Sequence, residues 1–210
     1  MKKLLFVLPI VVLLVAGCGK TATTQGNNSQ NGAPDQQQVK VPVKTIDVPM
    51  PTKAYVSAKD GFTANFPGIP NVKKSSLPSS SLGPIPVTEY RQVFTQDKEQ
   101  AYYNIGVYHY PADYEFPDNY LNTIFKTFYT VVTLEFPDAK IASQQPAQFL
   151  GNPAVAGEII GPDKLADGST VNKSGYLLIT VKNQNTYIIS AYGMDQANFK
   201  AFTDSFKFAQ

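Results

Sequence analysis

The pattern of apolar and polar residues predicts a series of β-strands from about residue 62 onward. Residues 62–66 alternate between apolar and polar side chains and stop at Pro67-Gly68. Residues 88–95 and 102–110 are rich in β-forming residues. Two hairpins are predicted farther on, with strands at 148–149 and 154–160 around Gly151-Asn152-Pro153, and at 176–181 and 186–192 around Lys182-Asn183-Gln184-Asn185.

Two segments are predicted to be helices. Asp118 follows Pro117 and can cap the first helix by accepting backbone N–H bonds. Pro137 ends this segment, whose apolar residues recur at helical spacing: Leu121, Ile124, Phe125, Phe128 and Val132. The second helix is predicted to begin near Asp195, with Phe199, Phe202 and Phe206 on one stripe.

Neighbouring hairpins with few helices predict an α+β fold, in which helices pack against a twisted, largely antiparallel sheet. The runs Leu177-Leu178-Ile179 and Tyr187-Ile188-Ile189 are apolar at successive positions, which favours strands covered on both faces. About 155 residues, from 54 to 210, are enough for one domain with one core.

Two stretches resemble PsbP-like domains. Residues 60–70, Asp-Gly-Phe-Thr-Ala-Asn-Phe-Pro-Gly-Ile-Pro, are similar to the first strand and Phe/Tyr-Pro turn of that family. Residues 199–208 are similar to its last helix, which runs through Ser-Phe into a short strand. The resemblance covers residues 54–210 and implies an α/β/α sandwich, although the tryptophan that many members carry is absent. It implies little about function.

The first 17 residues are organised as a secretory signal. Lys2 and Lys3 precede an apolar run over residues 4–16, which is shorter than the about 20 residues that a membrane span needs. Val15-Ala16-Gly17-Cys18 resembles the bacterial lipobox, which implies cleavage before Cys18 and lipidation of its thiol. The alternative is an ordinary signal that is cut elsewhere and leaves Cys18 as a free thiol.

A lipid anchor implies a place in the bacterial cell envelope. The protein would lie on the outer leaflet of the cytoplasmic membrane, or on the outer membrane facing the periplasm. Residues 18–53 are expected to form a polar and proline-containing tether, because residues 19–38 offer almost no apolar surface to bury. A flexible chain of about 34 residues spans about 30–35 Å.

Charge and composition exclude several classes of function. Removal of Lys2 and Lys3 lowers the formal charge from +2 to zero, which disfavours nucleic-acid binding. One histidine and one cysteine make a zinc site improbable, and Asp163 to Ser169 lacks the ligand pattern of a calcium loop. No phosphate-binding loop is present either, so no cofactor is expected.

Catalysis through histidine would have to use His109, the only one in the chain. Alternation along residues 102–110 places His109 on the face of Tyr103, Ile105 and Val107, which favours a structural histidine at the rim of the core. No Gly-x-Ser-x-Gly nucleophile motif accompanies it. The chain is therefore not expected to be an enzyme.

A tyrosine-rich segment is the candidate binding surface. Tyr108, Tyr110, Tyr114 and Tyr120 are predicted to form an exposed recognition patch, because tyrosine offers contact area and a polar tip. The alternative is that these tyrosines cover the sheet under a helix. The sequence thus favours a non-catalytic binding or accessory lipoprotein for an unknown envelope protein or small ligand. A small-molecule-binding lipoprotein with an aromatic pocket is the alternative, and an envelope hydrolase comes third.

Overall fold

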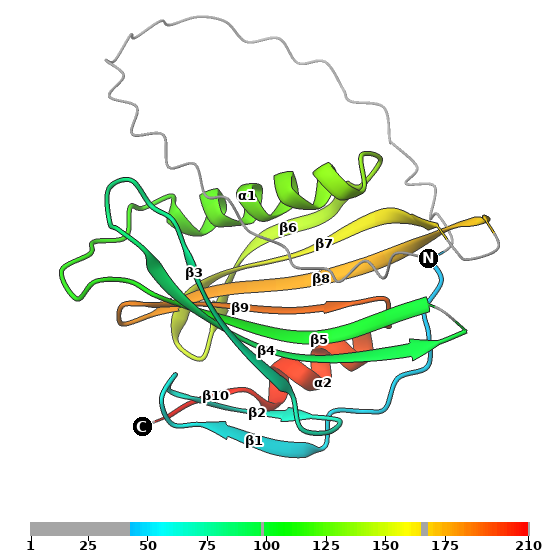
Figure 1. Cartoon of the computed structure of the whole chain (residues 1–210), viewed down its shortest axis with the longest axis horizontal. Coiled ribbons are helices and arrows are strands. Elements are labelled where there is room, and N and C mark those ends of the chain that lie inside the picture. The colour runs from blue at the N-terminus through cyan, green and yellow to red at the C-terminus, as the bar shows by residue number, and fades with distance from the viewer. Residues whose placement is uncertain (1–42, 98, 165–167, 210) are drawn as a thin grey trace, which may run out of the picture.

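The computed structural model describes residues 43–97, 99–164 and 168–209. The predicted signal peptide, Cys18 and the tether up to residue 42 lie outside the described residues. The described chain forms two antiparallel sheets and two helices (Figure 1). This confirms the α+β class and the antiparallel sheet that the sequence predicts.

The larger sheet has seven strands, each antiparallel to its neighbours. Their order across the sheet is β3 (Asn71–Leu77), β4 (Ile85–Gln96), β5 (Glu99–His109), β9 (Asn185–Tyr192), β8 (Thr170–Lys182), β7 (Asn152–Lys164) and β6 (Lys140–Phe149). Both predicted hairpins are present, as β6–β7 and β8–β9. Strands β3 and β6 form the two edges.

The smaller sheet has three strands in the order β1 (Lys53–Ser57), β2 (Phe62–Phe66) and β10 (Lys207–Phe208). Strand β2 matches the predicted alternating segment, and its Phe62, Ala64 and Phe66 are buried. Figure 1 shows this sheet and α2 (Gln196–Ser205) on one side of the large sheet, and α1 (Tyr120–Glu135) on the other.

The central strands of the large sheet are buried on both faces because a separate apolar cluster covers each face. Along β5, Tyr103, Ile105 and Val107 face the cluster that includes α2 and the small sheet. Tyr108 points the other way, into the cluster beneath α1. The side-chain period of two in a strand separates these sets, as the sequence predicts.

The two helices begin differently. Asp195 caps α2 by accepting a bond from Asn198 N at 2.8 Å, as predicted. The predicted cap at Asp118 is wrong, because α1 begins after Asn119, whose φ of −94° and ψ of 9° are not extended and whose side chain makes no capping bond. Phe206 lies just past the end of α2, and its buried ring stacks on Phe62.

Contacts with the large sheet begin before the predicted domain start at residue 54. Residues 43–51, here called the N-terminal strap, are fixed to the large sheet instead of belonging to a tether that ends at residue 53. Lys44 N donates to Asn172 O at 2.8 Å, and Ile46 N donates to Gly193 O at 3.0 Å. Ile46 and Val48 are buried in the cluster below the sheet. Two apolar side chains of this proline-containing segment therefore belong to the core.

Candidate functional site

The four predicted surface tyrosines lie around the N-terminal end of α1. Tyr108, Tyr110 and Tyr120 are buried, with 7%, 9% and 5% of their surface exposed, and Tyr114 is partly buried. The expectation of an exposed patch is therefore wrong for three of them. They cover the sheet under a helix, which is the alternative that the sequence left open.

Tyr110, Tyr114 and Tyr120 form a compact aromatic cluster with Phe116. The rings of Tyr110 and Tyr114 stack at 4.8 Å, and Phe116 lies 4.6 Å from Tyr120. Tyr120 Oη donates to Tyr110 Oη at 2.7 Å and lies 2.8 Å from Thr186 Oγ1. Burial raises the pKa of the Tyr120 hydroxyl well above its usual value. The cluster therefore stays neutral and joins the β5–α1 loop to the sheet.

A small cavity lies beside this cluster, between α1 and the sheet. Its volume of about 10 Å³ is enough for about one water molecule. The cavity is lined mainly by aromatic and aliphatic side chains: Leu77, Tyr108, Tyr110, Tyr120, Ile124, Thr127, Phe128, Thr186 and Ile188. Drug-sized ligands need a pocket of about 300 Å³ or more, so this cavity does not hold one.

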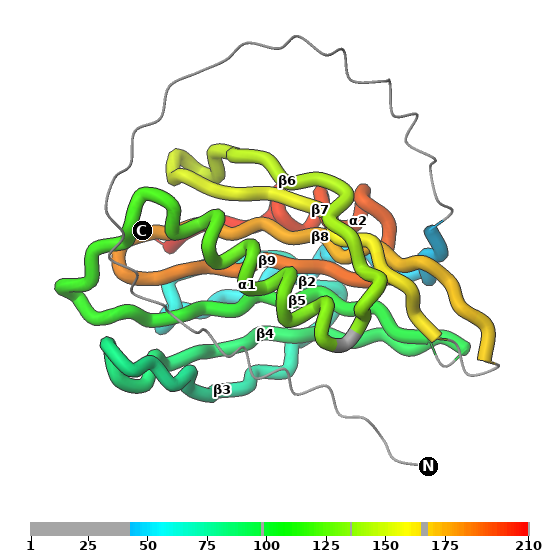
Figure 2. The backbone as a smooth tube through the Cα atoms, turned by 90° about the horizontal axis from the view of Figure 1, so that it is seen from above, coloured from blue at the N-terminus to red at the C-terminus, as the bar shows by residue number. Residues whose placement is uncertain are grey.

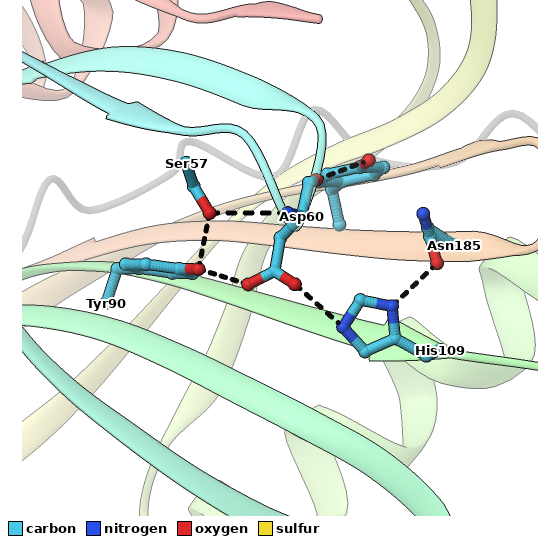
Figure 3. Close-up of polar contacts among 6 residues, drawn as sticks. Ser57, Asp60, Tyr90, His109 and Asn185 are labelled. Atoms are coloured by element: carbon cyan, nitrogen blue, oxygen red, sulfur yellow. Dashed lines mark hydrogen bonds and ion pairs between the residues drawn. The ribbon is translucent and has the colours of Figure 1, made fainter. Parts of the chain in front are cut away.

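His109 belongs to a polar network that joins the two sheets (Figure 3). Its Nε2 lies 3.2 Å from Asp60 Oδ1, and its Nδ1 lies 2.9 Å from Asn185 Oδ1. The fully buried Asp60 carboxylate also accepts a hydrogen bond from Tyr90 Oη. Ser57 Oγ lies 2.6 Å from the same tyrosine hydroxyl.

This network differs from a serine hydrolase triad in the order of its members. Asp60 lies between His109 and the Tyr90–Ser57 pair, so Ser57 does not contact the imidazole that would have to activate it. Within the described part of the chain, the two ring nitrogens of His109 contact Asp60 and Asn185. Burial raises the pKa of Tyr90, which keeps its hydroxyl a hydrogen-bond donor.

Sequence reasoning placed His109 at the core rim but missed Asp60 as its partner. Asp60 stands in the β1–β2 turn before Gly61, whose φ of 67° is the left-handed conformation that glycine adopts most easily. An Asp-Gly pair predicts such a turn. Nothing local predicts that the small sheet brings this turn beneath β5.

A second charged cluster holds the N-terminal strap. Lys173 is fully buried, and its Nζ lies 2.8 Å from Asp163 Oδ2 and 3.4 Å from Glu99 Oε2. Lys44 of the strap donates to Glu99 Oε1. The hydrogen bond from Lys44 lowers the pKa of the Glu99 carboxyl, against the opposing effect of burial. Asp163, considered above for a calcium loop, is therefore paired with Lys173.

Among the described residues, no group of three or more His, Cys, Asp or Glu side chains is placed to bind a metal ion. No helix in the same part of the chain is long and apolar enough to span a membrane.

Comparisons with solved structures find several similar chains, one of which is described here. No protein-family model matches the chain, and no curated protein matches its sequence. The chain is similar to the solution structure of cyanobacterial PsbP (CyanoP) from Synechocystis sp. PCC 6803, with a TM-score of 0.48 and 15% identity. The match covers 84% of this chain and 99% of that chain. The fold assignment rests on the strand order and helices described above.

Proposed function

We propose that this chain is a bacterial envelope lipoprotein, anchored through lipidated Cys18, whose folded domain is a non-catalytic binding or accessory module. We further propose that the architecture of this domain is a PsbP-like α/β/α sandwich. The lipobox-like Val15-Ala16-Gly17-Cys18 supports the anchor. The arrangement around His109 is the observation that carries the non-catalytic part.

The N-terminal strap fixes the position at which the chain enters the folded domain. Because Lys44 and Ile46 bond to the large sheet, the chain is fixed to the domain at the strap, which lies 26 residues after Cys18 at Lys44. An anchor at Cys18 would thus act on the end of the sheet where the strap enters.

The contacts of His109 argue against hydrolysis. A general base must reach the proton of its nucleophile, and His109 is occupied by Asp60 and Asn185 within the described residues. The alternative of a small molecule in an aromatic pocket is less favoured, because the cavity beside Tyr108 and Tyr120 has a volume of about 10 Å³.

Intact-mass analysis of the protein purified from its native membrane tests the anchor, with Cys18→Ala as the control. The expected mass is that of a chain starting at Cys18 with added acyl groups, absent from the variant. An unmodified chain cut elsewhere would overturn the proposed anchor.

A hydrolysis assay with chromogenic esters tests the non-catalytic role. We expect the same background rate for wild type and His109→Asn. A rate above background that His109→Asn abolishes would make the protein an enzyme.

A further inference from the structure

The chain contains a single arginine among its 18 basic residues, and this arginine has an unusual setting. Arg91 lies in β4, and its guanidinium carbon is 4.2 Å from the centre of the Tyr102 ring on β5. The Tyr102 ring also stacks on Tyr192 of β9 at 5.5 Å. Stacking on an aromatic ring fixes the plane of a guanidinium, a property that lysine lacks.

A row of polar side chains crosses the large sheet at Arg91. Asn71 of β3 and Asn104 of β5 are its register partners on either side, and Asn104 in turn pairs with Ser190 of β9. Alternation places Asn104 on the same face of β5 as Tyr108, the face that carries α1. Figure 2 shows β3 beside α1 and not beneath it, so α1 does not extend over the β3 edge of the sheet.

Two buried atoms in this row make no hydrogen bond within the described chain. They are Arg91 Nε and Asn104 Oδ1, which come from register partners on adjacent strands. Buried polar atoms in native proteins nearly always have a partner. The requirements of the two are complementary, because Nε–H needs an acceptor and Oδ1 needs a donor.

The charges around Arg91 are compatible with a bound anion. Described carboxylates form no ion pair with Arg91, in contrast to Lys44, Lys173 and Lys200. Glu89 is on the same face of β4 and has Lys73 of β3 as its register partner. A planar guanidinium without a protein carboxylate binds a ligand carboxylate through two parallel hydrogen bonds.

We propose that Arg91 and Asn104 form a binding site for a hydroxy-carboxylate, the group shared by uronic-acid sugars and small hydroxy acids. The carboxylate binds the Arg91 guanidinium, a neighbouring hydroxyl donates to Asn104 Oδ1, and Tyr102 holds the arginine in place. This site deepens the binding role proposed above and does not depend on lipidation.

Saturation-transfer NMR on the full chain in detergent tests the site with four probes. Glucuronate and lactate carry both groups, acetate carries only the carboxylate, and glucose carries only hydroxyls. We expect saturation of glucuronate or lactate and at least tenfold weaker binding of acetate and glucose. Glucuronate alone would indicate a sugar-borne ligand, whereas equal binding of lactate would indicate a small acid.

Three variants separate recognition from structure. Arg91→Lys keeps the charge but loses the planar fork, and Asn104→Ala removes the acceptor, so each is expected to weaken binding at least fivefold. Lys74→Gln is the matched control, because Lys74 is exposed and neighbours Lys73 on the opposite face of β3. Thermal melting of each variant verifies that it is folded.

The proposal is overturned if wild type binds neither hydroxy acid, if acetate or glucose binds equally well, or if folded Arg91→Lys binds like wild type. Those results leave the envelope-anchor proposal standing, because that one is decided by the mass at Cys18. Conversely, an unlipidated Cys18 would leave a positive binding result intact.

Discussion

Asp60 and His109 connect the two sheets of this protein. Asp60 lies in the turn between β1 and β2 of the small sheet, and its Oδ1 is 3.2 Å from His109 Nε2 at the end of β5. The backbone carbonyl of Asp60 accepts a further bond from Tyr187 Oη of β9 at 2.9 Å. One turn residue is therefore held by the large sheet through both its side chain and its main chain.

Replacing Asp60 by Asn is expected to lower the free energy of unfolding by about 2–3 kcal/mol. The change replaces one carboxylate oxygen by an amide NH2, so the one remaining oxygen cannot serve both Tyr90 Oη and His109 Nε2, and bonds to buried charged groups are worth about that much. Urea denaturation measures the loss. Asp204→Asn is the control, because Asp204 pairs with Lys200 on the exposed side of α2 and should change stability by less than about 0.5 kcal/mol. Equal effects in both variants would contradict the role of Asp60.

The local sequence pattern predicted strands whose side chains are buried in the core. It missed strands whose side chains are mostly exposed. Strand β2 alternates because Phe62, Ala64 and Phe66 are buried. Strand β3 has no such pattern, because six of its seven residues are exposed at the sheet edge. Strand β3 forms because its backbone pairs with that of β4. A polar edge strand also resists pairing with other chains.

The predicted tyrosine site shows the same limit. Alternation correctly separated Tyr108 from the face of Tyr103. Whether Tyr108 is exposed depends on where α1 docks, and that position is set by side chains distant in sequence. Phe125 of α1, for example, lies over Gly157 of β7, where any larger residue would collide with it.

Gly157→Ala is expected to destabilise the fold by about 1–3 kcal/mol. A Cβ at this position would lie 2.5 Å from Phe125 Cε2 and 2.6 Å from the backbone oxygen of Ser143, so neither side can yield easily. Gly175→Ala on the adjacent strand β8 is the matched control, since its nearest neighbour is 3.7 Å away. The midpoint of urea unfolding should fall for Gly157→Ala and stay nearly constant for Gly175→Ala. Similar midpoints for the two variants would mean that α1 is not seated on Gly157.

Acid should weaken the attachment of the strap. The pKa of Glu99 is lowered from 4.5 in the folded protein, so its carboxylate stabilises the fold above about pH 4.5, and this contribution is lost as the pH falls through the folded pKa. Lys44→Gln removes the main cause of the shift. Because Lys44 is half exposed, we expect a loss of under about 1 kcal/mol at pH 7.

The pH dependence distinguishes this pair from a general surface effect. Unfolding free energies of wild type and Lys44→Gln, measured in urea from neutral to acid pH, should converge as the pH falls through the lowered folded-state pKa of Glu99, because protonated Glu99 gains nothing from Lys44. Lys53→Gln on β1 serves as the control and should show no such convergence. A difference that stays constant at every pH at which the protein remains folded would exclude Glu99 as the partner of Lys44.

Removal of the strap should affect stability far more than removal of the residues before it. A chain starting at Val43 keeps Ile46 and Val48, which expose only 7% and 4% of their surface, whereas a chain starting at Lys53 loses both. Burial of two aliphatic side chains contributes about 3–5 kcal/mol, so the shorter chain should unfold at clearly lower urea concentration. Full-length protein and the chain starting at Val43 should unfold together. If the chain starting at Lys53 also unfolds with them, the strap does not contribute to stability, and the domain begins near residue 54 as the sequence predicts.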